Sequence, residues 1–89
     1  MKRKTSYFSG HVQGIGFRYT AQNIAAKHEV RGYVRNLSDG RVELVLEGSD
    51  EHINEVLQAI QQKMEGFVRK VQTQESPATG EFVDFSILG

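Results

Sequence analysis

VRGYVRNLSDGRVELVLEG, residues 30–48, alternates between apolar and polar side chains on either side of a short turn. The apolar face of its second half consists of Val42, Leu44 and Leu46. Glu43 and Glu47 fall on the other face, which we expect to be solvated. Between the two halves, Asp39-Gly40 tolerates the positive φ that hairpin loops need. The stretch therefore predicts two strands joined by a tight turn.

Helical patterns lie on both sides of these strands. The helix that follows is expected to be capped by Ser49 or Asp50 and to stop at Gly66. Its predicted buried stripe consists of Ile53, Val56, Leu57, Ile60 and Met64. The helix that precedes the strands begins at Phe17. Its predicted buried face consists of Phe17, Ala21, Ile24, Ala25 and His28.

Three further strands complete the predicted order. We expect them at about residues 4–9, at about residues 67–75, and near the C-terminus. The last of these would place Val83, Phe85 and Ile87 on one face. The order βαββαβ, with an extra short C-terminal strand, predicts an α+β ferredoxin-like two-layer sandwich, in which both helices pack on one face of a mainly antiparallel sheet. Because this fold hosts many unrelated functions, the function has to be argued from a site.

The composition is that of a single globular domain over residues 1–89. Basic and acidic residues number 11 each, so net charge gives no reason to expect a nucleic-acid partner or an anionic membrane. There is no cysteine, which excludes disulfides and thiolate chemistry. No apolar run approaches the roughly 20 residues of a membrane span, and no secretory signal is apparent. We expect a cytoplasmic monomer.

One glycine-rich segment, GHVQGIGFR at residues 10–18, lies between a predicted strand and a predicted helix. Glycines let successive backbone N–H groups turn toward one point, and a helix N-terminus favours the same negative charge. The guanidinium of Arg18 could add two charge-assisted hydrogen bonds to a phosphoryl group. The alternative is a tight connection beside a surface arginine. An arginine at a helix start, where the helix dipole favours acidic side chains, argues for a bound anion.

Other polar residues give weaker signals. Asn36 ends its predicted strand, where an asparagine on its own indicates turn chemistry. The histidines His11, His28 and His52 show no metal-ligand spacing, so no metal site is predicted. The RNA-binding consensus of aromatic sheet domains is absent.

Two segments resemble signatures of a known family. SGHVQGIGFR at residues 9–18 resembles the first acylphosphatase signature. GYVRN at residues 32–36, continued by DGRVE at residues 39–43 and closed by Gly48, resembles the second. Both stand in the family's order, and the resemblance covers nearly the whole chain. Ile15, where valine is usual, preserves apolar character, as does Phe8 in the first strand.

The resemblance implies an acylphosphatase, which hydrolyses the carboxyl-phosphate bond of acyl phosphates to a carboxylate and inorganic phosphate. Arg18 matches the arginine that binds the substrate phosphate together with the loop amides. Those amides belong to His11, Val12, Gln13, Gly14, Ile15, Gly16 and Phe17. Asn36 matches the asparagine that orients the attacking water. Inorganic phosphate would be a product or inhibitor, and no cofactor is implied.

The residues are compatible with this chemistry. A carboxylate leaving group has a conjugate acid of pKa about 4, so it departs without a general acid. Arg18 and the loop supply positive charge, so no metal is needed. Three rival hypotheses remain: a module that senses a phosphorylated metabolite, an RNA-binding domain, and a domain acting on carbamoyl phosphate within a larger maturation enzyme, as related domains do. Because the chain ends at Gly89, we expect a free-standing enzyme.

Overall fold

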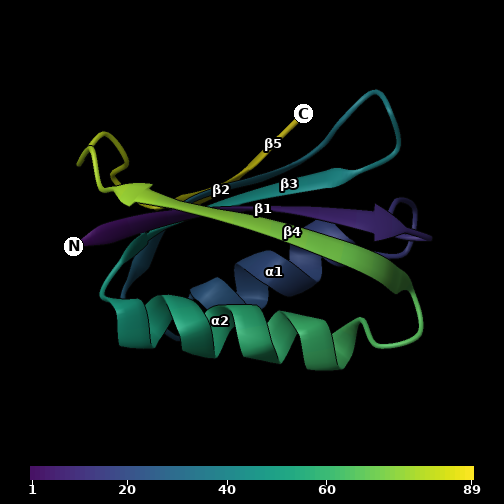
Figure 1. Ribbon diagram of the computed structural model, residues 1–89, viewed down its shortest axis with the longest axis horizontal. Coiled ribbons are helices and arrows are strands. Elements are labelled where there is room, and N and C mark those ends of the chain that lie inside the picture. The colour runs from purple at the N-terminus through teal and green to yellow at the C-terminus, as the bar shows by residue number, and fades with distance from the viewer.

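The computed structural model describes all 89 residues and shows two helices lying against one face of a five-stranded sheet (Figure 1). In chain order the elements are β1 Lys2–Gly10, α1 Phe17–Ala25, β2 Val30–Asn36, β3 Val42–Gly48, α2 Asp50–Lys63, β4 Val68–Pro77 and β5 Phe85–Leu88. The strand order is β4-β1-β3-β2-β5, in which only the β2–β5 pair is parallel. The predicted ferredoxin-like sandwich with an extra C-terminal strand is confirmed.

The core lies between the helices and the sheet, where the predicted apolar faces meet. The five predicted core positions of α2 are all buried. Ser49 is the N-cap of α2, and its side chain accepts a hydrogen bond from the backbone N–H of His52 at 3.2 Å. On the sheet, Val42, Leu44 and Leu46 are fully buried. These residues fold as expected because their spacing matches the period of each element.

Some element boundaries and one burial prediction differ from expectation. The strand β1 begins two residues earlier than predicted, at Lys2, and β4 ends two residues later than predicted, at Pro77. Main-chain pairing between these two strands extends them, because it continues from Lys2–Pro77 to Gly10–Val68. Val83 was expected on the buried face of the last strand, which is wrong: it lies before β5 and is 86% exposed. The β2–β5 ladder begins only at Gly32 and Phe85.

The expectation of a solvated face for Glu43 and Glu47 is also wrong. Their exposed fractions are only 7% and 6%. Aromatic and arginine side chains from neighbouring strands cover Glu43, whereas Arg3 and the segment after β4 cover Glu47. Alternation along a strand shows which side chains share a face, but not what covers that face.

One end of the sheet gathers the predicted functional residues. There β1 ends at Gly10, β2 ends at Asn36, and α1 begins at Phe17. The β2–β3 turn and the α2–β4 turn lie at this same end, on the right of Figure 1. Neither helix is long and apolar enough to cross a membrane.

Candidate active site

The loop between β1 and α1 presents free backbone amides. Its first N–H group, that of His11, donates to the carbonyl oxygen of Phe67 at 2.9 Å. No backbone carbonyl accepts a hydrogen bond from the N–H groups of residues 12–16. Gly16 is the N-cap of α1 in the left-handed conformation, with φ of 80° and no side-chain cap. The loop and the N-terminus of α1 therefore offer unpaired N–H donors to an anion.

The apolar side chains of the loop anchor it to the core. Val12 is fully buried, and Phe17 is 2% exposed with its ring centroid 4.9 Å from that of Phe8. Ile15 packs half-buried against the same core. Only the backbone of these three residues is therefore available to a phosphate. The side chain of His11 is exposed and lies near the ring of Phe67.

Gln13 ties the loop to the β2–β3 turn. Its side-chain amide donates to the carbonyl oxygen of Leu37 at 2.8 Å and to that of Arg41 at 3.0 Å. Leu37 directly follows Asn36, so this bridge sets the position of the loop relative to the end of β2. The family resemblance implies only a backbone role for Gln13, and no local pattern indicates the partners of its side chain, which lie in a turn far along the chain.

Arg18 and Asn36 reach the same corner of the sheet. Arg18 lies in the first turn of α1, and its Nη1 donates to the carbonyl oxygen of Gly89 at 2.9 Å. The parallel β2–β5 register pairs Arg35 with Leu88, which makes the next two residues, Asn36 and Gly89, neighbours at the strand ends. The fold thus brings together the predicted arginine, the predicted asparagine and, through Gln13, the glycine loop.

A buried carboxylate stiffens the sheet next to Asn36. Glu43 accepts hydrogen bonds from Tyr33 at 2.8 Å, Arg35 Nε at 2.6 Å and Tyr7 at 3.1 Å. Burial would raise the pKa of Glu43, but these hydrogen bonds outweigh it and hold the pKa below its ordinary value. Burial and the bond to Glu43 raise the pKa of Tyr33 to about 12. The network therefore links three central strands through a charge that stays ionised.

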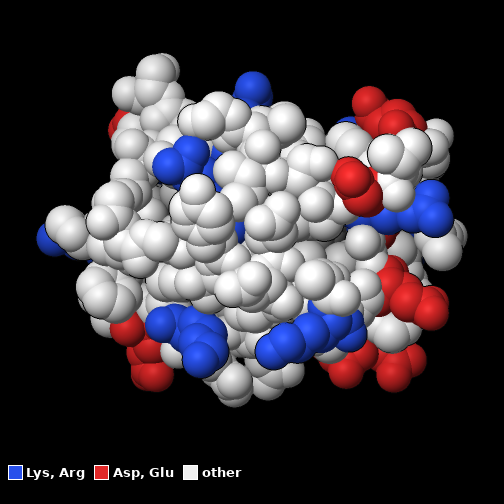
Figure 2. Space-filling model, turned by 180° about the vertical axis from the view of Figure 1, so that it is seen from behind, with Lys and Arg blue, Asp and Glu red and all other residues white.

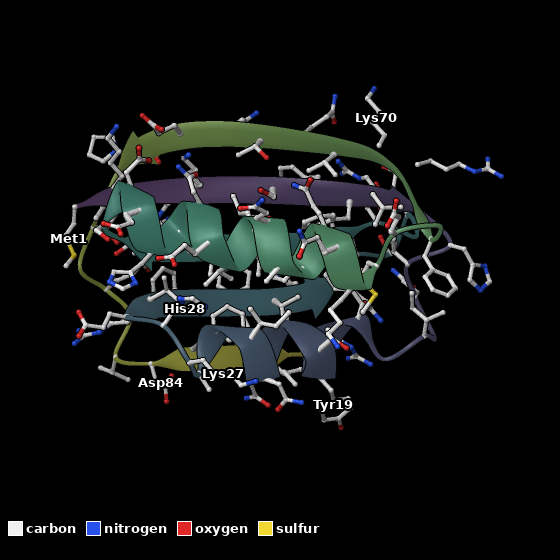
Figure 3. All side chains as sticks on the ribbon, turned by 90° about the horizontal axis from the view of Figure 1, so that it is seen from below. Met1, Tyr19, Lys27, His28, Lys70 and Asp84 are labelled. Carbon is white, nitrogen blue, oxygen red and sulfur yellow. The ribbon has the colours of Figure 1, made fainter.

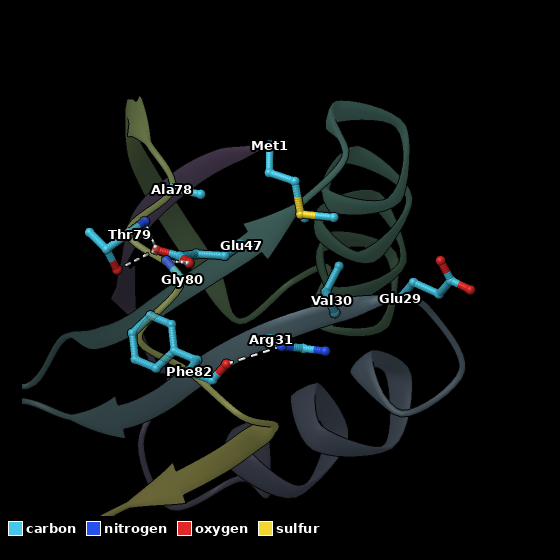
Figure 4. Close-up of a pocket in the computed structure, with 10 residues that line it drawn as sticks. Met1, Glu29, Val30, Arg31, Glu47, Ala78, Thr79, Gly80 and Phe82 are labelled. Atoms are coloured by element: carbon cyan, nitrogen blue, oxygen red, sulfur yellow. Dashed lines mark hydrogen bonds between the residues drawn. The ribbon is translucent and has the colours of Figure 1, made fainter.

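A hollow lies at the opposite end of the sheet (Figure 4). Its volume is about 720 Å³, and its lining includes Glu29, Arg31, Glu47 and Phe82. Glu47 accepts the N–H groups of Thr79 and Gly80 as well as Arg3, and these donors outweigh burial to lower its pKa to about 2. The hollow therefore contains a carboxylate that stays ionised, and it lies away from the glycine loop.

The surface carries no continuous basic field on the face seen in Figure 2. Lys and Arg side chains form separate groups among uncharged side chains, with acidic groups nearby. This matches the balanced composition of 11 basic and 11 acidic residues. Attraction of an anion must therefore come from local donors such as the loop amides.

The fold and this site define a small two-layer α+β domain whose first strand-to-helix loop presents free amides beside an arginine. The acylphosphatase family model matches residues 4–87. The chain belongs to the acylphosphatase family, hydrolases that act on acid anhydrides containing phosphorus.

Individual relatives agree with this assignment. The chain is 42% identical to an acylphosphatase of Paenarthrobacter aurescens over 87 residues, which cover 97% of this chain and 93% of that protein. The crystal structure of acylphosphatase from Bacillus subtilis matches with a TM-score of 0.92 and 32% identity, covering all of both chains. T. kodakarensis HypF matches with a TM-score of 0.85 and 32% identity, but the match covers only 12% of that chain.

Proposed function

We propose that the N–H groups of residues 12–17 and the guanidinium of Arg18 bind the phosphoryl group of an acyl phosphate, and that Asn36 orients the attacking water. The N–H of His11, which the family resemblance also implies as a donor, is left out because it already donates to the carbonyl oxygen of Phe67. The observation that carries this proposal is the convergence of free loop amides, Arg18 and the end of β2 at one corner of the sheet. A protein catalyses phosphoryl transfer mainly by positioning the reactants and by stabilising the negative charge on the phosphoryl oxygens.

In the proposed reaction, the water oxygen forms a bond to phosphorus while the bond between phosphorus and the carboxyl oxygen breaks. The bonding electron pair leaves on the carboxylate, which needs no proton because its conjugate acid has a pKa of about 4. Asparagine is a poor base, so the proton of the water passes to a phosphate oxygen of the substrate. The loop amides and Arg18 stabilise the charge on the equatorial oxygens.

We also propose that residues 1–89 act as a single, monomeric, cytoplasmic domain, with no metal in the reaction and no nucleic-acid partner. The balanced charge and the absence of cysteine support this proposal. Light scattering in solution would give the mass of a monomer near the chain mass of 10.0 kDa. A larger mass would contradict the monomer.

The test is hydrolysis of benzoyl phosphate, followed by its loss of ultraviolet absorbance, in the presence of EDTA. Wild type should turn over at full rate with the chelator. Asn36→Ala should lose turnover by about 10²-fold, because a misaligned water loses the benefit of orientation. Inhibition by inorganic phosphate should remain, since Asn36 does not hold the phosphoryl group.

Asn23→Ala serves as the matched control, since Asn23 is exposed on α1. It should behave as wild type in both assays. If Asn36→Ala lost phosphate binding along with turnover, or unfolded the domain, Asn36 would be a structural turn residue rather than the group that orients water. Turnover that disappears with EDTA would overturn metal independence.

A further inference from the structure

Three metal-ligating side chains meet where the end of α1 passes the start of α2. His28 lies in the turn after α1, while His52 and Glu55 lie three residues apart in α2. One ligand atom from each of these residues lies within 4.8 Å of the other two. The sequence gives no sign of this cluster, because only the packing of the two helices brings His28 and His52 together.

His52 carries the one buried side-chain nitrogen or oxygen of the protein that has no hydrogen-bond partner, its Nδ1 atom. The nearest carboxylate oxygen, Oε1 of Glu55, is 3.8 Å away, beyond hydrogen-bond distance. The ring centroid of His28 is 6.1 Å from that of His52, with the rings edge to face. A buried nitrogen that has no hydrogen-bond partner and lies close to a carboxylate and a second imidazole is available as a metal ligand.

Hydrogen bonds fix the main chain at both histidines. The backbone N–H of His52 donates to the Ser49 cap at 3.2 Å, and that of His28 donates to the carbonyl oxygen of Ala25 at 3.1 Å. Figure 3 shows His28 at the end of α1 opposite Tyr19, so the cluster is separated from the glycine loop by the length of α1. A helix of this length spans roughly 14 Å.

The donor set selects the kind of cation. Two neutral imidazole nitrogens and one carboxylate oxygen are ligands that Zn²⁺ takes in tetrahedral sites, with water in the fourth position. Mg²⁺ and Ca²⁺ prefer oxygen ligands throughout. Tetrahedral ligands at zinc–nitrogen distances of about 2.0 Å stand about 3.3 Å apart. Glu55 is exposed, so rotation of its side chain can close the remaining gap.

The charge around the cluster favours a cation despite the positive end of α2. Asp50 and Glu51 lie in the first turn of α2, next to His52. Lys4 pairs with Asp50 at 3.4 Å. The carboxylates of Glu51 and Glu55 have no lysine or arginine partner. The local field of these acidic groups offsets the helix dipole.

We infer that His28, His52 and Glu55 form a Zn²⁺ site that links the turn after α1 to the first two turns of α2. The site joins the two helices into one layer, and it stands apart from the residues proposed to act in hydrolysis. Bound Zn²⁺ stabilises the folded chain because the three ligands come together only in that state.

The experiment uses untagged, chelator-treated full-length protein titrated with ZnCl₂ at pH 7.5 by calorimetry. Wild type should bind one ion, and its melting temperature should rise with ZnCl₂. His28→Gln and Glu55→Gln, whose side chains are partly or largely exposed, should fold normally and bind at least tenfold more weakly. Glu51→Gln is the matched control: it removes a carboxylate from the same helix, one turn before Glu55, and should keep wild-type affinity within about twofold.

Imidazole ¹⁵N chemical shifts identify the ligands directly. Addition of ZnCl₂ should shift one ring nitrogen of His28 and one of His52, while His11 stays unchanged. Hydrolysis of benzoyl phosphate below the melting temperature should be the same with and without Zn²⁺, so this test is independent of the catalytic proposal. Absence of binding by folded wild type, wild-type affinity in His28→Gln, or shifts at His11 instead would each overturn the inference.

Discussion

Arg18 stands where the dipole of α1 would favour an acidic side chain, and the first turn of that helix contains no acid. Its guanidinium is directed to the edge of the sheet by the carbonyl oxygen of Gly89. A planar guanidinium held in this way can donate hydrogen bonds to two oxygens of a phosphoryl group at once, whereas a lysine ammonium group acts only as a point charge.

Arg18→Lys should therefore fail to replace the arginine. We expect kcat/KM for benzoyl phosphate to fall by about 10²- to 10³-fold, the usual cost of removing one donor that stabilises developing charge. Arg31→Lys, an exposed substitution at the other end of β2, should retain wild-type kinetics. Near-normal activity in Arg18→Lys would mean that simple charge is sufficient at this position.

Gln13→Ala tests the bridge between the loop and the β2–β3 turn. Loss of the bridge frees Asn36 to shift relative to the loop, so kcat should fall about tenfold. Stability should fall by only about 1 kcal/mol, because two carbonyl oxygens lose a neutral donor. Gln58→Ala, an exposed change on α2, is the control for both measurements. A fall in stability with unchanged kcat would give Gln13 a structural role alone.

At the level of single residues, the sequence points to Arg18 and Asn36 because they belong to motifs whose order and separation are specific. It points to the loop glycines for the same reason. It does not reveal the partners of Gln13, and it misplaces Glu43 and Glu47 on a solvated face. What those side chains contact is decided by chain segments far away in sequence, and no local period carries that information.

Among the elements, the β2–β3 pair depends on one close approach. A Cβ atom at Gly32 would stand 1.8 Å from the carbonyl oxygen of Val45 in the neighbouring strand, and Gly32 has a φ of 145°. Both the contact and the backbone conformation exclude an ordinary side chain. This glycine thus allows β2 to lie between β3 and β5.

Gly32→Ala should destabilise the protein by at least about 3 kcal/mol, because β2 has to move away from β3. The measurement is the free energy of unfolding in urea. Gly66→Ala is the control, since its φ is also positive, at 92°, but a Cβ there meets nothing within 4 Å. Gly66→Ala should lower the free energy of unfolding by only about 1 kcal/mol, which is the cost of placing a side chain at a positive φ without a steric clash. Equal costs at both positions would show that crowding against Val45 is unimportant.

Elements were predicted best where one face is apolar and the ends carry capping residues. The helix α2 is the clearest case, with its Ser49 cap and its complete buried stripe. The short strand β5 was predicted less well, and Val83 was misplaced. An edge strand of four residues is defined by its pairing to β2 rather than by alternation of its own side chains.

Across the whole molecule, Glu47 connects the sheet to the segment after β4 through Arg3, Thr79 and Gly80. Its pKa is about 2 in the folded protein, against an ordinary value of 4.5. Because the folded-state pKa is the lower one, this carboxylate stabilises the fold fully above about pH 4.5. The stabilisation is lost as the pH falls from about 4.5 to about 2.

Urea unfolding between pH 7 and pH 2 should therefore show a falling midpoint below about pH 4.5. Glu47→Gln should lower the free energy of unfolding at pH 7 by about 2 kcal/mol, the scale of lost hydrogen bonds to a charged group. In this variant the free energy of unfolding should also fall less steeply between about pH 4.5 and pH 2. Glu51→Gln controls for the change in net charge and should follow the wild-type curve. If the free energy of unfolding of Glu47→Gln fell with pH as steeply as that of wild type, other carboxylates would be responsible for the sensitivity to acid.

The position of β1 has a consequence for how the protein is made. This strand is the first of the five to be synthesised, yet it lies between β3 and β4, and its Lys2 pairs with Pro77. On the ribosome, the apolar side chain of Phe8 stays unburied until its neighbours in β3 and β4, Val42 and Val71, have been translated. The nascent chain therefore cannot complete this sheet before β4 and β5 have been translated, so the sheet forms late and through slow, long-range strand pairing.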